Sequence, residues 1–301
     1  MNRVTFTTWI RAARLRTIPL SISGILVGSA SAFLKDDFNI SVFTLAIFTT
    51  ICYQLLSNFA NDYGDGVKGT DNDERLGPKR ILQSELISRA QLRQAIFIIS
   101  GVAVLLTILL VYNAFGLSRT ALSFLGLGFF AIVAAIRYTV GSNAYGYKGF
   151  GDLFVFLFFG CVSVLGSHYL FTFEFDFSLI FPAISIGLLS VGVLNINNMR
   201  DRVNDKQFGK TTIAVRLGAE KSALYQLALV VTPLILTVVY GLIYHAFAFF
   251  VMSAIMMIPI SHHLNIVFQK QSEKALDPEL KKIALLTFFY AISFSLLLIF
   301  F

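Results

Sequence analysis

The chain has few charged residues and few cysteines. Only 14% of its 301 residues are Asp, Glu, Lys or Arg, well below the share found in soluble domains. Its two cysteines, Cys52 and Cys161, lie inside apolar runs, which excludes a disulfide scaffold and a cysteine-rich zinc site. What remains is 56% hydrophobic, with a mean hydropathy of +0.74. The composition therefore predicts an integral membrane protein.

The excess of positive charge is explained by membrane topology. A formal net charge of +7 is also found in proteins that bind nucleic acid. Here the basic residues lie in the segments between apolar runs, as they do in membrane proteins. We therefore expect a lipid bilayer around the chain and no nucleic-acid partner.

Nine apolar runs are long enough to be membrane spans, which need about 20 residues each. The sequence thus predicts an all-α transmembrane bundle in a single domain covering residues 1–301. The expected spans lie near residues 17–34, 41–60, 94–112, 120–138, 150–171, 179–197, 224–242, 247–262 and 283–301.

The basic residues also predict the orientation of the bundle. Of the 24 Lys and Arg residues, 22 lie in the N-terminal segment or after an even-numbered span, and only Lys35 and Arg119 lie on the other side. Positively charged loops stay in the cytoplasm. We therefore expect a cytoplasmic N-terminus, a C-terminus on the opposite side, and cytoplasmic loops after the second and sixth spans.

The first unusual stretch begins where the second apolar run ends. Asn58, Asp62 and Asp65 stand at positions i, i+4 and i+7, so they share one face if the helix continues through Asp65. Carboxylates at the end of a membrane span are costly and therefore indicate function. Oxygen ligands grouped in this way suit Mg²⁺, which keeps some waters and bridges to phosphate oxygens.

A second acidic stretch follows the sixth span. Asn197, Asp201 and Asp205 stand at positions i, i+4 and i+8, which again places oxygen-bearing side chains on one helical face. The pattern Asn-x-x-x-Asp thus occurs twice, each time at the cytoplasmic end of an even-numbered span. Solvated charges at a helix end explain either motif alone, whereas the matched pair favours one site shared across the bundle.

Two facing carboxylate clusters would hold two Mg²⁺ ions on a diphosphate, above a central apolar cavity that accepts a hydrocarbon chain. The metals would neutralise the charge on a departing diphosphate and leave an allylic carbocation where little water is present. Such a cation alkylates an electron-rich ring. The sequence thus predicts transfer of a long allylic chain from a diphosphate to an electron-rich ring.

The two acidic stretches resemble the two motifs of the UbiA-type intramembrane prenyltransferases. The matching segments are Asn61-Asp62-Tyr-Gly-Asp65 with Lys68-Gly-Thr-Asp71, and Asn197-Asn198-Met-Arg-Asp201-x-x-x-Asp205 with Gly209-Lys210-Thr211. Within that superfamily, residues 57–65, 75–80, 138–141 and 145–152 look most like the branch that acts on 1,4-dihydroxy-2-naphthoate. The resemblance implies transfer of the polyprenyl chain to that acid, with loss of carbon dioxide and diphosphate, to give demethylmenaquinone in the inner membrane.

We assign expected roles to the residues of these motifs. Asp62, Asp65, Asp201 and Asp205 are the expected Mg²⁺ ligands. The other expected site residues supply supporting oxygens, diphosphate contacts or acceptor contacts, and are Asn58, Asn61, Lys68, Asp71, Arg80, Arg137, Tyr138, Tyr145, Asn197 and Lys210. The basic residues among them also serve as topology charges, and the two tyrosines also suit an interfacial aromatic belt.

The sequence departs from the family pattern at three positions. Gly69 stands where a third aspartate is expected, and its role passes to Asp71 in the naphthoate branch. Ala144 replaces an expected proline, which predicts a backbone φ near that of proline, about −65°. Lys148 replaces an apolar residue.

Two alternatives stay open at this stage. The first keeps the prenyl transfer and changes the acceptor to 4-hydroxybenzoate or homogentisate, because residue spacing does not distinguish these rings. The second is a cation-coupled transporter. A transporter predicts acidic residues at mid-membrane depth and matched interrupted spans, and the sequence shows neither.

Overall fold

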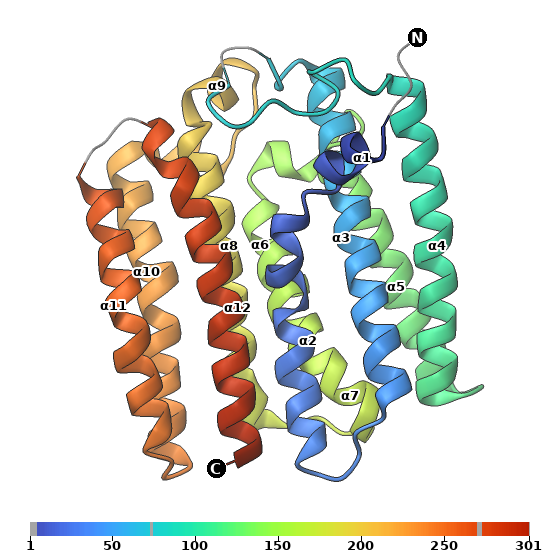
Figure 1. Cartoon of the computed structure of the whole chain (residues 1–301), viewed down its shortest axis with the longest axis vertical. Coiled ribbons are helices and arrows are strands. Elements are labelled where there is room, and N and C mark those ends of the chain that lie inside the picture. Colours follow the sequence, from blue (N-terminus) through green and yellow to red (C-terminus); the bar gives the residue numbers. More distant parts are fainter. Residues whose placement is uncertain (1–4, 73–74, 270–272, 301) are drawn as a thin grey trace.

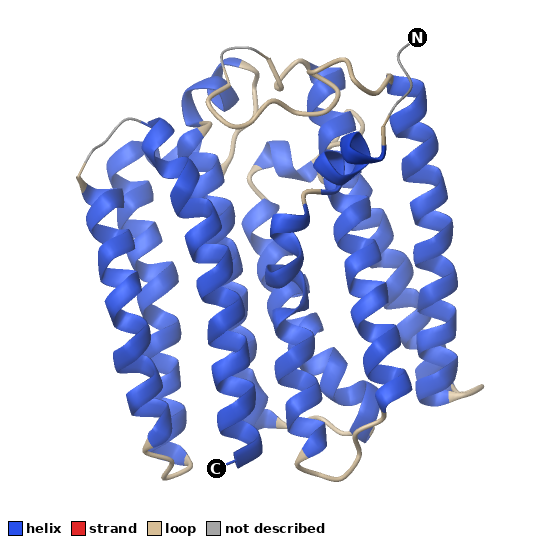
Figure 2. Cartoon of the chain, viewed as in Figure 1, coloured by secondary structure: helices blue, strands red, loops and turns tan. Residues whose placement is uncertain are grey.

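The computed structural model describes residues 5–72, 75–269 and 273–300. All regular structure in these ranges is helical, as Figure 2 shows. The predicted all-α fold is confirmed. The expected end of the ninth span, residue 301, and two of the counted basic residues, Arg3 and Lys270, lie outside the described residues.

Nine helical segments of the described chain are long and apolar enough to cross a membrane, and each overlaps one predicted span. They lie nearly side by side, with the labelled N-terminus at one end of the bundle and the C-terminus at the other (Figure 1). The segments are Phe6–Phe33, Ile40–Lys68, Arg89–Phe115, Arg119–Arg137, Gly151–Thr172, Phe177–Arg200, Ile213–Ile243, Ala248–Phe268 and Glu273–Phe300.

The first segment is interrupted before it enters the bundle. Helix α1 (Phe6–Ala13) ends at Arg14, whose φ of 49° is left-handed. A short 3₁₀ turn, η1 (Leu15–Thr17), then leads into α2 (Ile18–Phe33). Helix α1 therefore lies across the end of the bundle in Figure 1 while α2 runs along it.

Helices α3 (Ile40–Lys68), α4 (Arg89–Phe115) and α5 (Arg119–Arg137) complete the first part of the bundle. The fifth span is irregular, with α6 (Gly151–Val155), a π-helical stretch η3 (Phe156–Gly166) and α7 (Ser167–Thr172). A 3₁₀ turn, η2 (Tyr145–Lys148), precedes it. π-Helical turns are rare and are frequently found at functional sites.

The second part is built from α8 (Ile180–Arg200), α10 (Ile213–Ile243), α11 (Ala248–Phe268) and α12 (Asp277–Phe300). The short α9 (Arg202–Gln207) joins α8 to α10 at the end where α1 lies. The remaining 3₁₀ turns are η4 (Phe177–Leu179) and η5 (Glu273–Leu276). The main buried apolar cluster lies in this part, with Ile186, Ile283 and Phe294 each 0% exposed.

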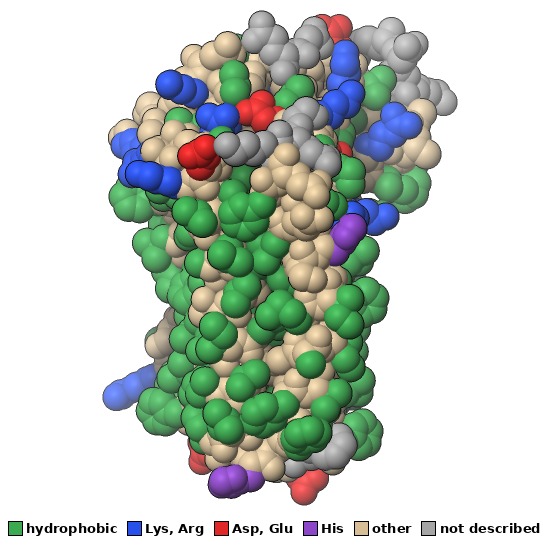
Figure 3. All heavy atoms as spheres, turned by 90° about the vertical axis from the view of Figure 1, so that its left-hand side faces the viewer, with side chains coloured by type: hydrophobic (Ala, Val, Ile, Leu, Met, Phe, Trp, Pro, Cys, Tyr) green, Lys and Arg blue, Asp and Glu red, His purple; other side chains and the backbone are tan. Residues whose placement is uncertain are grey.

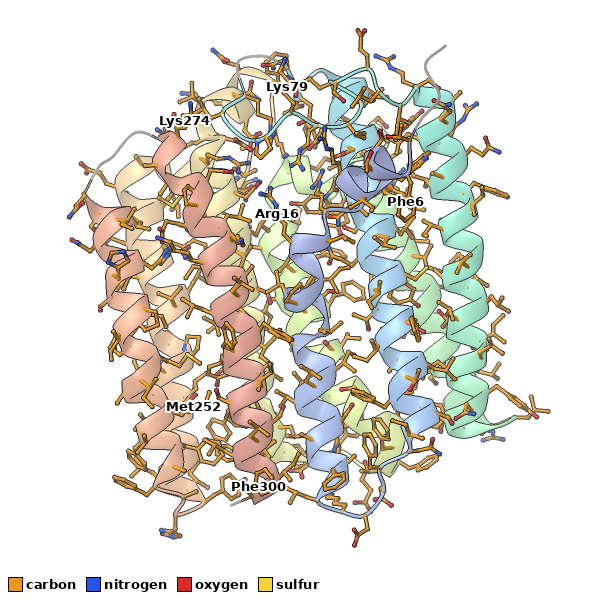
Figure 4. The ribbon with its side chains drawn as sticks, viewed as in Figure 1. Phe6, Arg16, Lys79, Met252, Lys274 and Phe300 are labelled. Atoms are coloured by element: carbon orange, nitrogen blue, oxygen red, sulfur yellow. The ribbon has the colours of Figure 1, made fainter. Side chains whose placement is uncertain are left out.

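Charged side chains gather at one end of the bundle. The face drawn in Figure 3 is mostly apolar along its length and carries its basic and acidic residues mainly at the upper end. Figure 4 labels Arg16, Lys79 and Lys274 toward that end, and Met252 and Phe300 toward the other. A band of apolar surface below a charged end is the arrangement expected of a protein surrounded by lipid.

Candidate active site

The first acidic motif lies on the last turns of α3. This helix continues past the predicted end of the span to Lys68, so Asp62 and Asp65 are helical, and both are buried with Asn58. The predicted shared face is confirmed. The helix ends at Gly69, whose φ of +77° is left-handed. Residues with a side chain rarely adopt that conformation, which accounts for glycine where the family pattern has aspartate.

The second motif is less regular than the sequence predicted. Helix α8 ends at Arg200, and Asp201 lies at the junction with α9. A single uninterrupted helical face from Asn197 to Asp205 was therefore the wrong expectation. The main-chain N–H of Asp205 still donates to the carbonyl of Asp201 at 2.8 Å, so the two buried carboxylates stay on neighbouring turns.

Lys210 joins the two motifs. Its Nζ lies 3.4 Å from Asp65 Oδ2 and 3.8 Å from Asp205 Oδ1, and its side chain is buried. These carboxylates are 140 residues apart in the sequence and share one ammonium group. The predicted meeting of the two motifs is thus present in the structure.

Arg75 makes a second connection between the motifs. Its Nη2 lies 2.9 Å from Asp201 Oδ2, and its Nε lies 3.4 Å from Asp71 Oδ1. A third connection is made by amides, because Asn204 Nδ2 donates to the Thr70 carbonyl at 2.8 Å. The segment after α3 is therefore fastened to α9 across the end of the bundle.

Asp62 and Asp201 each accept hydrogen bonds from a further arginine. Asp62 accepts a hydrogen bond from Arg14, and Arg80 Nη1 lies 3.7 Å from the same oxygen. Asp201 accepts two bonds from Arg200, at 2.9 Å from Nε and 2.7 Å from Nη2. A two-pronged bond of this kind fixes the orientation of a carboxylate as well as stabilising it.

The pKa values of these groups differ with their partners. Burial would raise the pKa of Asp201, but the hydrogen bonds from Arg200 and the charge of Arg75 hold it below its usual value. Burial raises the pKa of Asp205 to about 6, and the charge of Lys210 offsets only part of that rise. Asp205 thus carries its charge at a greater cost than Asp201 and gains more from a nearby cation.

The site also contains polar atoms without a hydrogen-bond partner. Among the described residues these include the buried Asp71 Oδ2, Asp205 Oδ2 and Asn198 Oδ1. Buried polar atoms are nearly always paired in proteins. All three are hard oxygen donors of the kind that Mg²⁺ prefers, so the donor set fits that ion.

The aspartates are spaced apart by the basic side chains. In the described part of the chain, no three Asp, Glu, His or Cys side chains are grouped closely enough to enclose a metal ion. Lysine and arginine lie between the carboxylates instead. The same cations are the natural partners of phosphate oxygens.

An apolar chamber of about 320 Å³ lies beside the first motif, within the range of ligand pockets. Asn61, which directly precedes Asp62, and Asn58, one helical turn earlier, line it together with Tyr138. Its walls come from α2 to α8 and include Ile25, Leu110, Val111, Phe124, Leu127, Phe154, Phe158, Phe159, Val162, Leu170 and Leu194. The predicted central apolar cavity is therefore present, and it adjoins the acidic motif.

The loop between α5 and α6 closes over this region. Thr139 Oγ1 donates to the Ala60 carbonyl at 2.9 Å, and Lys68 Nζ donates to the Thr139 carbonyl at 2.8 Å. Gly64 permits this approach, because a Cβ there would meet the Thr139 side chain at 2.5 Å. Tyr138 and Tyr145 both line the chamber, and Tyr145 stacks on Phe154 with ring centroids 4.1 Å apart.

Some expected site residues lie away from the acidic centre. Asn58 donates to the Ala13 carbonyl at 2.8 Å and so secures α1. Asn197 accepts a bond from Arg200 at 2.9 Å. Arg137 is exposed and is absent from the residues that line the chamber.

The sequence analysis did not single out several residues that the structure places in the site. Arg75, Arg200 and Tyr147 lie inside the matching segments but were given no role in the site, and Arg14 was counted only as a topology charge. The Tyr147 hydroxyl donates to Asp65 Oδ1 at 2.7 Å. Spacing gave no signal for the contacts of Arg14 with Asp62, Arg75 with Asp201 and Tyr147 with Asp65, because the partners are far apart in the chain. The contact of Arg200 with the adjacent Asp201 could have been found from the sequence.

These features define a class of membrane protein. Its site lies within the bundle of spans and suits a hydrocarbon chain that ends in an anionic group. The UbiA prenyltransferase family model matches residues 21–298. The chain therefore belongs to the UbiA prenyltransferase family, as the sequence motifs predicted.

Relatives and solved structures agree with this assignment. The chain is 41% identical to a 1,4-dihydroxy-2-naphthoate octaprenyltransferase of Haemophilus influenzae, with 96% of this chain and 94% of the relative covered. It is also 41% identical to the protein of the same name from Escherichia coli, over 78% and 76%. A UbiA homologue from Archaeoglobus fulgidus bound to DMAPP and Mg²⁺ shares the fold, with a TM-score of 0.64 at 14% identity, over 95% and 98%.

Proposed function

We propose that this protein transfers a polyprenyl chain from its diphosphate to 1,4-dihydroxy-2-naphthoate, giving the hydroquinone form of demethylmenaquinone, carbon dioxide and diphosphate. The observation that carries the proposal is the junction of two acidic motifs beside an apolar chamber, with Lys210 3.4 Å from Asp65 and 3.8 Å from Asp205. The relatives at 41% identity bear the name of this activity. The acceptor is taken from those names.

Different residues bind the two ends of the prenyl diphosphate. The chamber takes the hydrocarbon chain and keeps water away from its reactive carbon. Asp62, Asp65, Asp201 and Asp205 would hold Mg²⁺, with Asp71 in place of the missing third aspartate and Asn58, Asn61 and Asn197 in support. When bound there, the metal would supply positive charge that neutralises the leaving diphosphate.

Basic side chains bind the diphosphate together with the metal. Lys68, Arg80 and Lys210 lie among the aspartates and turn toward phosphate oxygens when the donor binds. The bond between the first prenyl carbon and the diphosphate oxygen breaks, and its electron pair leaves with the diphosphate. A ring carbon of the acceptor then forms the new carbon–carbon bond, and the acceptor carboxylate leaves as carbon dioxide. Tyr138 and Tyr145 contact the acceptor ring, and Arg137 is its most peripheral contact.

A product assay tests this function. The purified protein in detergent is given Mg²⁺, a polyprenyl diphosphate and one aromatic acid at a time, and the products are identified by mass. We expect the hydroquinone form of demethylmenaquinone from 1,4-dihydroxy-2-naphthoate, together with the quinone that forms when it oxidises in air. Product from 4-hydroxybenzoate or homogentisate alone would reassign the acceptor, and no product with any acid would overturn the proposal. No observation favours the transporter alternative.

We also propose that the protein lies in the inner membrane with both motifs facing the cytoplasm. Cysteines placed at Gly69, Gln207, Asp36 or Thr172, one at a time in a variant lacking Cys52 and Cys161, would report the side. Gly69 and Gln207 should react with an impermeant reagent from the cytoplasm, and Asp36 and Thr172 from outside. The reverse pattern would contradict this orientation.

A further inference from the structure

A second cavity opens beside the active site, and the proposed reaction leaves it unassigned. Its volume is about 780 Å³, within the range of small-molecule sites. It lies between the α5–α6 loop and the segment that joins α9 to α10. We call it the basic vestibule and define it by Lys68, Tyr147, Lys148, Phe150, Phe208 and Arg216.

The charge of the vestibule is of one sign. Lys68, Lys148 and Arg216 line it, and among the described residues that line it none is acidic. The last two side chains are exposed. Arg216 Nη2 donates to the Lys148 carbonyl at 2.6 Å, so the two cations come from different segments that are fastened together. The positive charge of the vestibule attracts anions, whereas the negative charge of the aspartates behind it repels them.

The vestibule also has aromatic walls. Tyr147, Phe150 and Phe208 line it with the cations, and Lys68 Nζ lies 3.7 Å from the centre of the Tyr147 ring. Aromatic faces accept flat rings, and cations accept a carboxylate. Together they match a ligand that carries both groups.

Tyr147 links the vestibule to the active site. Its ring lines the vestibule, while its hydroxyl donates to Asp65 Oδ1 at 2.7 Å. Lys68 is shared in the same way, because its ammonium group donates to the Thr139 carbonyl beside α3. The Tyr147 side chain therefore lies between the vestibule and Asp65 of the acidic centre.

We infer that the basic vestibule binds the anionic aromatic acceptor from the cytoplasmic side before it enters the active site. This inference rests on the proposed function, which requires an aromatic carboxylate to approach a site surrounded by aspartates. Lys148 and Arg216 capture the carboxylate, and the aromatic walls hold the ring. Lys148, which departs from the family pattern, thereby acquires a role.

Equilibrium binding tests the inference without catalysis. The full chain in detergent, without Mg²⁺ or prenyl donor, is titrated with 1-hydroxy-2-naphthoate and with neutral 1-naphthol by calorimetry. We expect tighter binding of the acid. The double variant Lys148→Gln/Arg216→Gln should weaken acid binding about five- to tenfold, since each exposed charge contributes little and two act together.

Two matched variants show whether the position of the charge matters. Lys148→Arg/Arg216→Lys keeps both charges and should bind the acid within about twofold of wild type. Lys221→Gln/Lys281→Gln removes two other exposed charges and should leave binding unchanged. An equal loss of acid binding in the Lys221→Gln/Lys281→Gln control would overturn the inference. So would unchanged acid binding in Lys148→Gln/Arg216→Gln.

A lipid headgroup could supply a similar negative charge, so the source of the anion is tested separately. The acid titration is repeated in nanodiscs of phosphatidylcholine and of phosphatidylglycerol, and with inorganic phosphate present. We expect similar acid affinity in each. Displacement of the acid by phosphatidylglycerol or by phosphate would assign the vestibule to phosphate groups and overturn the proposal.

Kinetics separates this inference from the proposed function. In the Lys148→Gln/Arg216→Gln variant, KM for the acceptor should rise about five- to tenfold while kcat and KM for the prenyl donor stay constant. Charge-dependent acid binding by a wild-type protein that makes no product would refute the proposed function alone. Normal product formation with an unchanged acceptor KM would refute the vestibule alone.

Discussion

The two parts of the bundle carry the same Asn-x-x-x-Asp spacing and are packed differently around it. Helices α8, α10, α11 and α12 supply most of one large buried apolar cluster. Helices α2 to α7 contain smaller clusters and most of the chamber wall. The repeated motif therefore stands in two different settings, since one part lines the chamber and the other forms the main apolar core.

A buried polar chain reinforces the supporting part. Asn195 on α8 donates to Gln226 on α10 at 2.9 Å, and Gln226 contacts His263 on α11 at 3.1 Å. His263 in turn lies 2.7 Å from Glu279 on α12. Each of these groups is buried, so the network is costly to break and fixes the four helices relative to one another. Asn195 thus secures α8 shortly before Asp201.

The largest expected effect comes from neutralising one aspartate in each part. Asp62→Asn and Asp201→Asn keep the size of the side chain and remove one negative charge from the cation site. Turnover at saturating Mg²⁺ should fall at least about a hundredfold to a thousandfold, as for the loss of one electrostatic group in other active sites. Initial rates of product formation measure this.

The same variants distinguish a metal site from solvated helix ends. Each change also leaves a buried arginine with a weaker partner, so the free energy of unfolding should fall by about 1–3 kcal/mol. Asp176→Asn, a cap of η4 near the opposite end of the bundle, is the control and should keep normal turnover. Near-normal turnover in both motif variants would refute the metal assignment. The two parts of the bundle would then not share one cation site.

An alanine-to-phenylalanine change in each part tests the difference in packing. Ala284 is 1% exposed in the main cluster, so Ala284→Phe should cost about 1–3 kcal/mol by overpacking. Ala131 lines the chamber, so Ala131→Phe should change the free energy of unfolding by only about 0.5 kcal/mol. Thermal unfolding in detergent measures both.

The Ala131→Phe variant should lose activity and keep most of its stability. Ala131→Phe should lower turnover with a long prenyl diphosphate by at least about tenfold and spare a short donor, because the added ring fills the space of the chain. Equal loss with both donors would show that the chamber does not hold the chain. Equal destabilisation by the two changes would show that the parts are packed alike.

The sequence was sufficient for features that depend on local periodicity. Apolar runs predicted every span, and the i, i+4, i+7 spacing predicted the shared face of Asn58, Asp62 and Asp65. It was insufficient where pairing is long-range. The arginines that hold the aspartates, Arg14 on Asp62 and Arg75 on Asp201, have no spacing rule that would separate them from topology charges. The turn at Asp201 also has no proline or glycine to mark it.

The smallest expected effect concerns Ala144, where the family pattern has proline. Its φ of −60° matches the predicted value, and its N–H does not appear as a donor among the described main-chain hydrogen bonds outside helices. A proline there loses no bond and restricts the unfolded chain, so Ala144→Pro should raise the free energy of unfolding by about 0.4–1 kcal/mol. Gly141→Pro, at a φ of +93°, is the matched control and should destabilise the loop. A lower melting temperature in Ala144→Pro would mean that the proline ring collides with the neighbours that bury this residue. Backbone shape alone would then not determine which residue is tolerated at position 144.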